Sequence, residues 1–114
     1  MDDHPGFRAQ ARALLVAAGY QVVGEAADGE SGVRVARELS PDVVLLDVQL
    51  PDITGFEVVR LVHGAPDPPV VVLISSRDAS DYGRRIERSG ARGFISKADL
   101  SARTLAAVLG ETAA

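Results

Sequence analysis

The sequence predicts an α/β domain built around a parallel sheet. Two apolar runs, 42–47 and 70–74, contain several consecutive Val, Leu and Ile residues, a pattern typical of strands buried on both faces. Segments with apolar residues at helical spacing alternate with these runs, and short connectors join them. Because 114 residues is the length of one domain, we expect residues 1–114 to form a single unit.

The first half of the chain contains a helix, a strand, a helix and a strand in that order. Apolar residues at helical spacing predict a first helix that ends before Gly19, and Gln21–Ala26 has the pattern of a strand. A second helix ends before Pro41, because the residue that precedes a proline disfavours helical backbone. The strand Asp42–Asp47 comes next, and a third helix begins near Thr54.

The second half repeats this alternation. Strand 70–74 leads into a fourth helix near residues 79–86, where Gly83 lowers the helix propensity by about 1 kcal/mol relative to alanine. A short strand at 93–97 and a last helix capped by Ser101 complete the pattern. Right-handed crossovers between such elements give a doubly wound, flavodoxin-like sheet with helices on both faces.

Composition narrows the classes of function. Apolar residues make up 46% of the chain, charged residues make up 25%, and the net charge is −4. This negative charge argues against bulk attraction to nucleic acid or to an acidic membrane, so we expect neither as a direct partner. The chain has no cysteine, which excludes disulfides and thiolate metal sites. No signal segment or membrane span is recognisable, and we expect a cytoplasmic protein.

Chemically active side chains stand at the carboxyl ends of the predicted strands. Asp47 and Ser75 end two of these strands, and Lys97 ends a third. Open α/β sheets bind ligands at this edge, so we expect these residues to converge there with Asp2 and Asp3. Three neighbouring carboxylates repel one another unless a cation lies between them, and Mg²⁺ is the hard, oxygen-seeking ion that suits such a site.

Asp47 is the candidate nucleophile of this group. Its free carboxylate oxygen would attack phosphorus, while Lys97 and the Ser75 hydroxyl would bind the phosphoryl oxygens. The backbone carbonyl of Gln49 would add a ligand to the metal ion. Asp47 taken alone has a second interpretation, because an Asp at the end of a strand often only caps the next turn.

Four segments of the chain resemble, in order and spacing, those of bacterial two-component response-regulator receiver domains: residues 2–5, residues 47–55, Ser75 and residues 93–97. The resemblance covers nearly the whole chain. It implies that Asp47 accepts a phosphoryl group and that Asp2 and Asp3 hold Mg²⁺. It also implies that Lys97 contacts the phosphate.

The same resemblance implies a switch. Ser75 would move toward the phosphate, and Phe94 stands where the family has its switch aromatic residue. The implied partners are a sensor histidine kinase or phosphotransfer protein and a downstream protein target, with a homodimer also possible. The expected function is therefore a stand-alone receiver in a phosphorelay, a phosphoacceptor rather than an enzyme.

Two other functions compete with this interpretation. A phosphatase of the haloacid-dehalogenase type also uses an Asp nucleophile after a strand, but it needs a second Asp two positions later, where this chain has Gln49. A pseudo-receiver would be an interaction module that takes no phosphate. The acidic, hydroxyl and lysine residues together argue against the pseudo-receiver.

The resemblance also implies that the first strand is truncated. Receiver domains have a short apolar strand before the acidic pair, and Met1 stands where its last residue would be. That strand would be central, between Gln21–Ala26 and Asp42–Asp47. We expect its neighbours to expose their edges, which favours self-association, low stability and weak Mg²⁺ binding.

Overall fold

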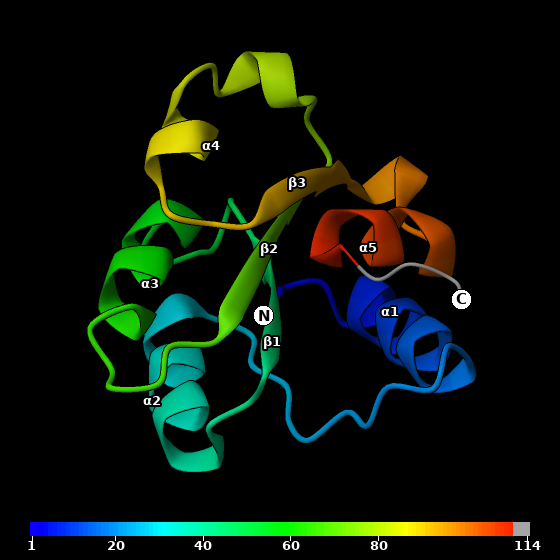
Figure 1. Cartoon of the computed structure of the whole chain (residues 1–114), viewed down its shortest axis with the longest axis horizontal. Helices are drawn as coiled ribbons and strands as arrows, with labels where there is room; N and C mark the ends of the chain where they lie inside the picture. The colour runs from blue at the N-terminus through cyan, green and yellow to red at the C-terminus, as the bar shows by residue number, and fades with distance from the viewer. Residues whose placement is uncertain (111–114) are drawn as a thin grey trace.

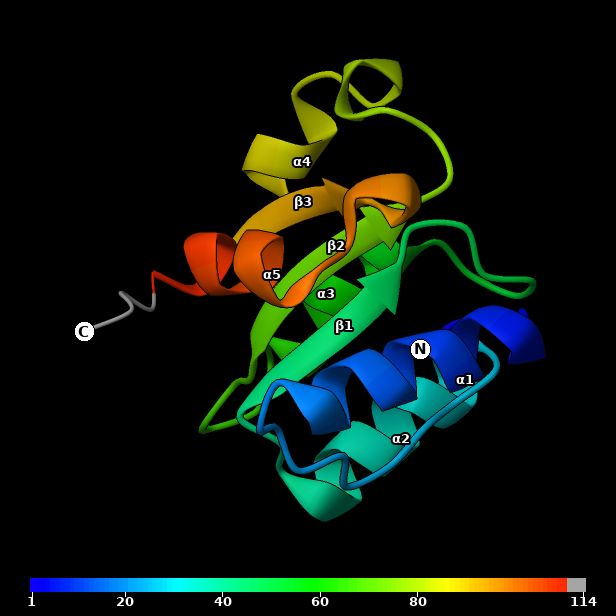
Figure 2. The ribbon, with the colours of Figure 1, turned by 90° about the vertical axis from the view of Figure 1, so that its right-hand side faces the viewer.

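A three-stranded parallel sheet forms the centre of the structure, a computed structural model that describes residues 1–110 (Figure 1). Its strands are β1 (Val43–Asp47), β2 (Val70–Ser75) and β3 (Gly93–Ser96), in the order β1-β2-β3. Leu45 is paired with Val72, and the register is parallel throughout. Because all three strands run the same way, their carboxyl ends meet at one edge of the sheet (Figure 2).

Helices cover both faces of this sheet, as the doubly wound pattern predicts. Helices α1 (Pro5–Ala17) and α5 (Ala102–Leu109) lie on one face, and α2 (Gly29–Leu39) and α3 (Gly55–Val62) lie on the other (Figure 1). The sequence prediction of an α/β fold with helices on both faces is thus confirmed. None of the helices among the described residues has the length and apolar character needed to cross a membrane.

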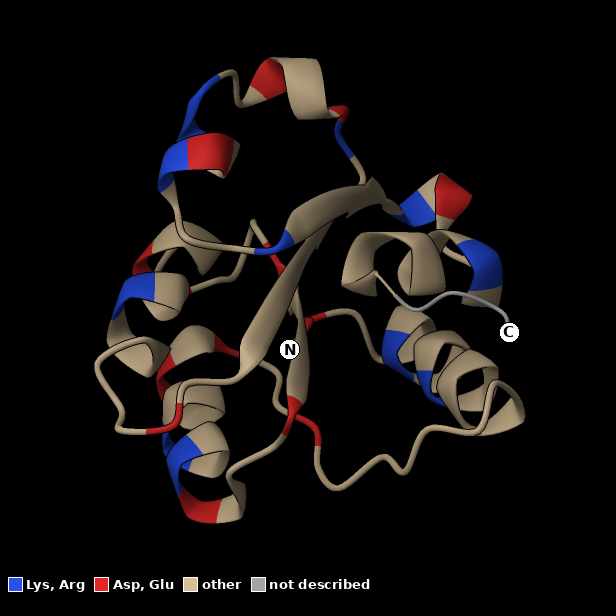
Figure 3. Cartoon of the chain, in the orientation of Figure 1, with Lys and Arg blue, Asp and Glu red and all other residues tan. Residues whose placement is uncertain are grey.

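Each face of the sheet has its own apolar core. Beneath α2 and α3, Leu46, Val58 and Leu73 are fully buried. On the other face, Val72 packs with Leu105 of α5. The charged residues lie mainly on helices and connecting loops, and β2 carries none (Figure 3). The strands therefore form an apolar support whose polar residues are concentrated at its ends.

Side-chain caps fix where the helices begin. The Asp28 carboxylate accepts a hydrogen bond from the Ser31 N–H and caps α2, and Ser101 caps α5 as the sequence predicts. The Asp52 carboxylate accepts hydrogen bonds from the N–H groups of Gly29 and Glu30, at 2.8 and 2.9 Å. These bonds lower the pKa of Asp52 and tie the loop after β1 to the start of α2.

The predicted fourth helix is broken into two pieces. A 3₁₀ turn occupies Ala79–Asp81, and α4 itself spans only Arg85–Arg88. Gly83, with a φ of +56°, separates the two pieces. The prediction of a helix over 79–86 was therefore wrong, because the left-handed backbone at Gly83 interrupts helical hydrogen bonding.

The predicted strand Gln21–Ala26 is absent, since these residues form no strand pairing. A strand exists only by hydrogen bonding to a neighbour, and among residues 1–110 no strand lies beside this segment. Met1 occupies the end of that position: its ammonium group donates to the Leu45 carbonyl at 2.7 Å, and the Asp47 N–H donates to the Met1 carbonyl. The Asp2 N–H donates in turn to the Ala26 carbonyl.

Candidate functional site

Three of the predicted site residues meet at the carboxyl edge of the sheet. Asp47 ends β1, Lys97 directly follows β3, and Asp2 reaches the same point from the N-terminus. The Lys97 ammonium nitrogen lies 2.6 Å from Asp2 Oδ2 and 3.0 Å from Asp47 Oδ2. Both carboxylates are only 3% exposed. The site is therefore a buried pair of carboxylates bridged by one lysine.

The loop after β1 holds the Asp47 side chain in place. The Gln49 N–H donates to Asp47 Oδ1 at 2.9 Å, so one carboxylate oxygen faces the loop while the other faces Lys97. Gly55 closes this loop by donating its N–H to the Val48 carbonyl at 2.7 Å. A Cβ atom at Gly55 would lie 2.5 Å from the Asp47 carbonyl oxygen, so only glycine permits this close approach.

The residues that follow Asp2 complete an acidic cluster. The His4 N–H donates to Asp2 Oδ1 at 2.8 Å, and His4 Nδ1 lies 3.2 Å from Asp2 Oδ1 and 3.1 Å from Asp3 Oδ1. One ligand atom from each of Asp2, Asp3, His4 and Asp47 lies within 4.8 Å of the other three. No role was predicted for His4 from the sequence, although its position next to the acidic pair was a signal for this contact.

The chemistry of this cluster fits a divalent cation. Three of its four residues offer carboxylate oxygens, the ligands that Mg²⁺ prefers. Among the described residues, the Lys97 ammonium is the only cationic group within ion-pair distance of the buried Asp2 Oδ2. Asp2 and Asp47 therefore carry two negative charges against one nearby lysine, which leaves the site attractive to a further positive charge. Ligation by the Gln49 carbonyl stays a prediction.

The two buried carboxylates have pKa values shifted in opposite directions. Burial raises the pKa of Asp47, and hydrogen bonds from the Gln49 N–H and Lys97 offset only part of this effect. Burial acts in the same sense on Asp2, but hydrogen bonds from Lys97 and the His4 backbone outweigh it and lower the Asp2 pKa. Burial lowers the pKa of Lys97, yet bonds to both carboxylates raise it overall. The bridging ammonium thus stays charged at neutral pH.

Ser75 lies at the end of β2, and its hydroxyl faces Tyr82, a contact that was not predicted from the sequence. Ser75 Oγ is 2.7 Å from the Tyr82 hydroxyl and accepts a hydrogen bond from the Arg77 N–H at 3.1 Å. Among the described residues it makes no hydrogen bond to Asp47. The Tyr82 ring packs between Phe56 and Phe94, with centroids 5.7 and 5.8 Å away. Tyr82 therefore connects Phe94 to Ser75: its ring packs against Phe94, and its hydroxyl lies at hydrogen-bond distance from Ser75 Oγ.

Lys97 has a further contact that the sequence did not reveal. Its ammonium nitrogen lies 4.5 Å from the centroid of the Phe7 ring on α1. The ring face attracts the cation and covers it from solvent. Because Phe7 and Lys97 are 90 positions apart, no local pattern could have indicated this pair.

Comparison with known proteins gives one consistent family. Residues 1–109 match the family described as the response regulator receiver domain. The transcription regulator BvgA of Bordetella pertussis is 36% identical over 97 residues, which cover 85% of this chain and 46% of BvgA. The DNA-binding transcriptional activator EvgA of Escherichia coli K12 is 30% identical over 108 residues, covering 95% of this chain and 53% of EvgA. The chain thus spans about half the length of these relatives.

Solved structures agree with this match. The signal receiver domain of the response regulator NarL from Mycobacterium tuberculosis has a TM-score of 0.81 and 34% identity, covering 96% of this chain and 92% of that one. The chemotaxis protein CheY4 of Vibrio cholerae has a TM-score of 0.82 and 28% identity, with 96% and 91% covered. The resemblance in sequence is therefore matched by a resemblance in fold.

Proposed function

The chain belongs to the family of response regulator receiver domains, and on that premise we propose that it is a phosphorylatable switch. We propose that residues 1–114 act as one receiver domain and that Asp47 is the phosphoacceptor. The observation that supports this assignment is the buried contact of Lys97 with Asp47 at 3.0 Å, at the carboxyl edge of the sheet. That contact supplies a nucleophilic oxygen with a cation beside it, as phosphoryl transfer to a carboxylate requires.

In the proposed reaction an Asp47 carboxylate oxygen forms a new bond to phosphorus. The bond from phosphorus to the donor, a phosphohistidine nitrogen or an acyl phosphate oxygen, breaks, and its electron pair leaves with the donor. Lys97 stays protonated because its pKa is raised, so it neutralises negative charge on the phosphoryl oxygens throughout. Asp47 Oδ1 accepts a hydrogen bond from the Gln49 N–H, which holds the carboxylate in position. Asp47 Oδ2 faces Lys97.

Mg²⁺ is the proposed cofactor. Asp2, Asp3 and Asp47 would hold it, together with the Gln49 carbonyl, and His4 lies close enough to orient the first two carboxylates. When bound, the ion would offset the charge that gathers on the transferred phosphoryl group. The ion would share these carboxylates with Lys97, which forms ion pairs with both Asp2 and Asp47 in this structure.

The proposed output is a change of surface that a protein partner reads. A phosphoryl group on Asp47 would attract the Ser75 hydroxyl, which in this structure is bonded to Tyr82. Loss of that bond would free Tyr82 and its neighbour Phe94 to repack. The donor would be a sensor histidine kinase or a phosphotransfer protein. The downstream protein target and any homodimer would bind the surface near α4 and β3.

Intact-mass spectrometry tests the assignment directly. With acetyl phosphate and Mg²⁺, the wild-type chain should gain the mass of one phosphoryl group, and Asp47→Asn should gain none. Asp42→Asn is the matched control, because Asp42 is an exposed carboxylate just before the other end of β1, and it should label like wild type. Chelating Mg²⁺ with EDTA should abolish labelling. Equal labelling of Asp47→Asn would refute the assignment, and an unlabelled, folded wild type would favour the pseudo-receiver.

A further inference from the structure

Phe7, in the first turn of α1, has a contact with the acidic site that nothing proposed above uses. The Lys97 ammonium nitrogen lies 4.5 Å from the centroid of the Phe7 ring. The other two phenylalanines of the chain, Phe56 and Phe94, pack against Tyr82 instead. Phe7 is therefore the phenylalanine whose ring lies against the proposed phosphate-binding lysine.

The Lys97 ammonium group has three partners among residues 1–110. Two are carboxylate oxygens, Asp2 Oδ2 at 2.6 Å and Asp47 Oδ2 at 3.0 Å, and the third is the Phe7 ring. Together they leave the Lys97 side chain only 13% exposed. The face of an aromatic ring attracts a cation although the ring itself is uncharged. The ring is therefore the one neutral partner of the three.

The proposed reaction alters both charged partners and leaves the ring unchanged. Asp47 would carry the phosphoryl group, and a bound metal ion would share Asp2 with Lys97. The four-carbon stem of a lysine is flexible, and in this structure the ammonium nitrogen lies closer to Asp2 Oδ2 than to Asp47 Oδ2. A contact that stays constant would keep the ammonium group near Asp47 while the charges around it change.

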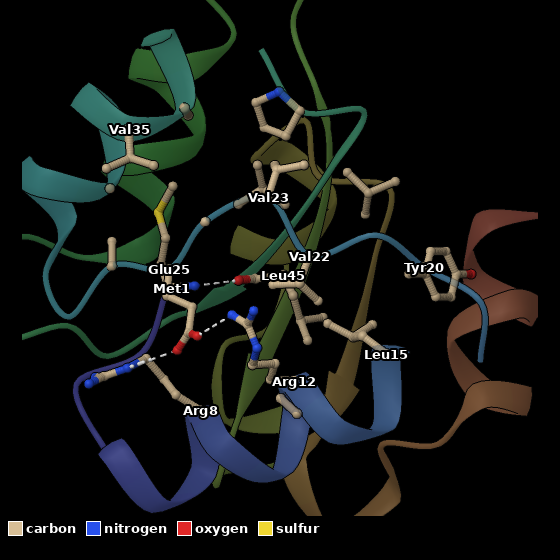
Figure 4. A pocket seen from close by; sticks show the side chains of 18 of the residues that line it. Met1, Arg8, Arg12, Leu15, Tyr20, Val22, Val23, Glu25, Val35 and Leu45 are labelled. Carbon is tan, nitrogen blue, oxygen red and sulfur yellow. Dashed lines mark hydrogen bonds and ion pairs between the residues drawn. The ribbon is translucent and has the colours of Figure 1, made fainter. Parts of the chain in front are cut away.

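The first turns of α1 are tied to the acidic site, which fixes the position of Phe7. The Arg8 guanidinium donates a hydrogen bond to the Asp2 carbonyl oxygen at 2.5 Å. Arg8 and Arg12 also form ion pairs with Glu25, at 3.6 and 2.8 Å (Figure 4). Phe7 thus precedes a residue that is bonded directly to the backbone of Asp2.

The Phe7 ring also packs against the apolar core on the face of the sheet that α1 and α5 cover. This core consists of four buried residues: Val72, Ile74, Ile95 and Leu105. Ile95 belongs to β3 and stands two positions before Lys97, so the ring contacts both the strand and the lysine that follows it. Packing against this core limits the movement of the ring and hence of the ammonium group that it contacts.

We propose that Phe7 is a positioning residue for phosphoryl transfer, because its ring holds the Lys97 ammonium group beside Asp47. This inference rests on the proposed function of Asp47 as phosphoacceptor. An aliphatic side chain at position 7 would fill much of the same space without attracting the cation. Lys97 would then be more accessible to solvent, and transfer to Asp47 would be slower.

Acetylation of Lys97 measures its accessibility without phosphate or metal ion. Lys97 is the only lysine of the chain, and cleavage at arginine releases it in the peptide 93–103. The folded 114-residue chain is given a short pulse of N-hydroxysuccinimidyl acetate in EDTA, then digested and analysed by mass spectrometry. Phe7→Leu should label about threefold faster than wild type. Phe7→Tyr should label like wild type, because it keeps the ring.

The rate of phosphorylation measures the consequence for transfer. With acetyl phosphate and Mg²⁺, intact-mass spectrometry should show an initial rate about threefold lower for Phe7→Leu, restored by Phe7→Tyr. Leu15→Ala is the control for lost packing, because Leu15 lies further along α1 and packs against the same core (Figure 4). It should lower the melting temperature and leave both rates unchanged.

The two measurements separate this inference from the proposed function. If wild type is phosphorylated and Phe7→Leu matches it in both rates, the inference is overturned and the proposed function stands. Equal effects of Leu15→Ala and Phe7→Leu, or faster acetylation without slower phosphorylation, would also overturn the inference. A folded wild type that takes no phosphate would overturn the proposed function and the role in transfer together, and acetylation would then report only the contact between Phe7 and Lys97.

Discussion

The hydroxyl of Ser75 and the hydroxyl of Tyr82 lie 2.7 Å apart in the interior of the protein. Ser75 ends the central strand β2, while Tyr82 belongs to the segment that connects β2 to β3. This hydrogen bond is thus a direct link between the sheet edge that carries Asp47 and the outer segment around α4. Since Phe94 has no hydroxyl, the tyrosine on the connecting segment is the residue that can report the position of Ser75.

A double-mutant cycle should measure this link. Ser75→Ala and Tyr82→Phe each remove one side of a buried hydrogen bond, and each should lower the free energy of unfolding by about 1–2 kcal/mol. The double variant should lose less than the sum, with a coupling energy of about 1 kcal/mol. Urea denaturation of the four proteins gives the values. Additive losses would show that the two hydroxyls do not stabilise each other.

Phosphorylation should loosen the segment between β2 and β3. We expect amide hydrogen exchange to change in residues 78–97 after treatment with acetyl phosphate and Mg²⁺, because Ser75 would leave Tyr82 for the phosphate. Tyr82→Phe should show part of this change without phosphate, since it already lacks the hydrogen bond. Unchanged exchange in this segment on phosphorylation would exclude this route of output.

Stability should rise between pH 6 and pH 8. The Met1 ammonium group has its pKa lowered from 8.0 to about 6 by burial, so the folded state carries a cost when that group is charged. Below pH 6 the full cost is present, at most about 3 kcal/mol, and it disappears as pH rises through 8. Urea denaturation across this range measures the slope. A chain acetylated at Met1 should lack the Met1 contribution and be more stable at pH 6.

Neutralising the two buried carboxylates should have opposite effects. The raised pKa of Asp47 means that its ionised form is disfavoured in the fold, so Asp47→Asn should increase stability at pH 7 without divalent cations. The lowered pKa of Asp2 means that its ionised form is favoured in the fold, so Asp2→Asn should decrease stability at pH 7. The Asp2 contribution is present above its unfolded-state pKa and is lost as pH falls through its lower folded value. Thermal denaturation with EDTA compares the two variants, and effects of the same sign would contradict the assigned shifts.

A strand supplied ahead of Asp2 should stabilise the fold. Among the described residues, β1 pairs with a strand on one edge, and Met1 alone supplies backbone hydrogen bonds to its other edge. We expect the 114-residue chain to be marginally stable or self-associating and to bind Mg²⁺ weakly, because an edge with so few bonds favours pairing with another chain. Five or six apolar residues placed before Asp2 should raise the melting temperature and tighten Mg²⁺ binding, since Asp2 would then follow a paired strand. Calorimetry and Mg²⁺ titration measure both effects. A monomeric, cooperatively melting chain that this extension does not improve would refute the expectation.

Helices and strands were predicted correctly where the local sequence pattern agrees with the environment of the segment in the folded chain. The apolar runs at β1 and β2, the start of α3 near Thr54, the Ser101 cap and the end of α2 before Pro41 were all predicted, because burial and capping act over a few residues. Asp2, Asp47 and Lys97 were also placed correctly at one edge, since parallel strands must end there together.

The wrongly predicted strand and the contacts that were not predicted depend instead on tertiary packing. Residues 21–26 have the composition of a strand, but pairing depends on a neighbour that composition cannot report. The contacts of Tyr82 with Ser75 and of Phe7 with Lys97 depend on how elements pack, so spacing alone could not reveal them. His4 was overlooked because a histidine at the start of a helix is usually a surface residue.

The left-handed turn at Gly83 has a consequence for how the domain can diversify. Because the turn divides the segment between β2 and β3 into a 3₁₀ turn and a four-residue helix, substitutions there disturb few helical hydrogen bonds. The exposed residues of this segment, among them Arg84, Arg85 and Arg88, can therefore change without altering the apolar sheet that supports Asp47. The outer surface of this segment can thus vary in charge and shape while Tyr82, its buried residue, keeps the contact with Ser75.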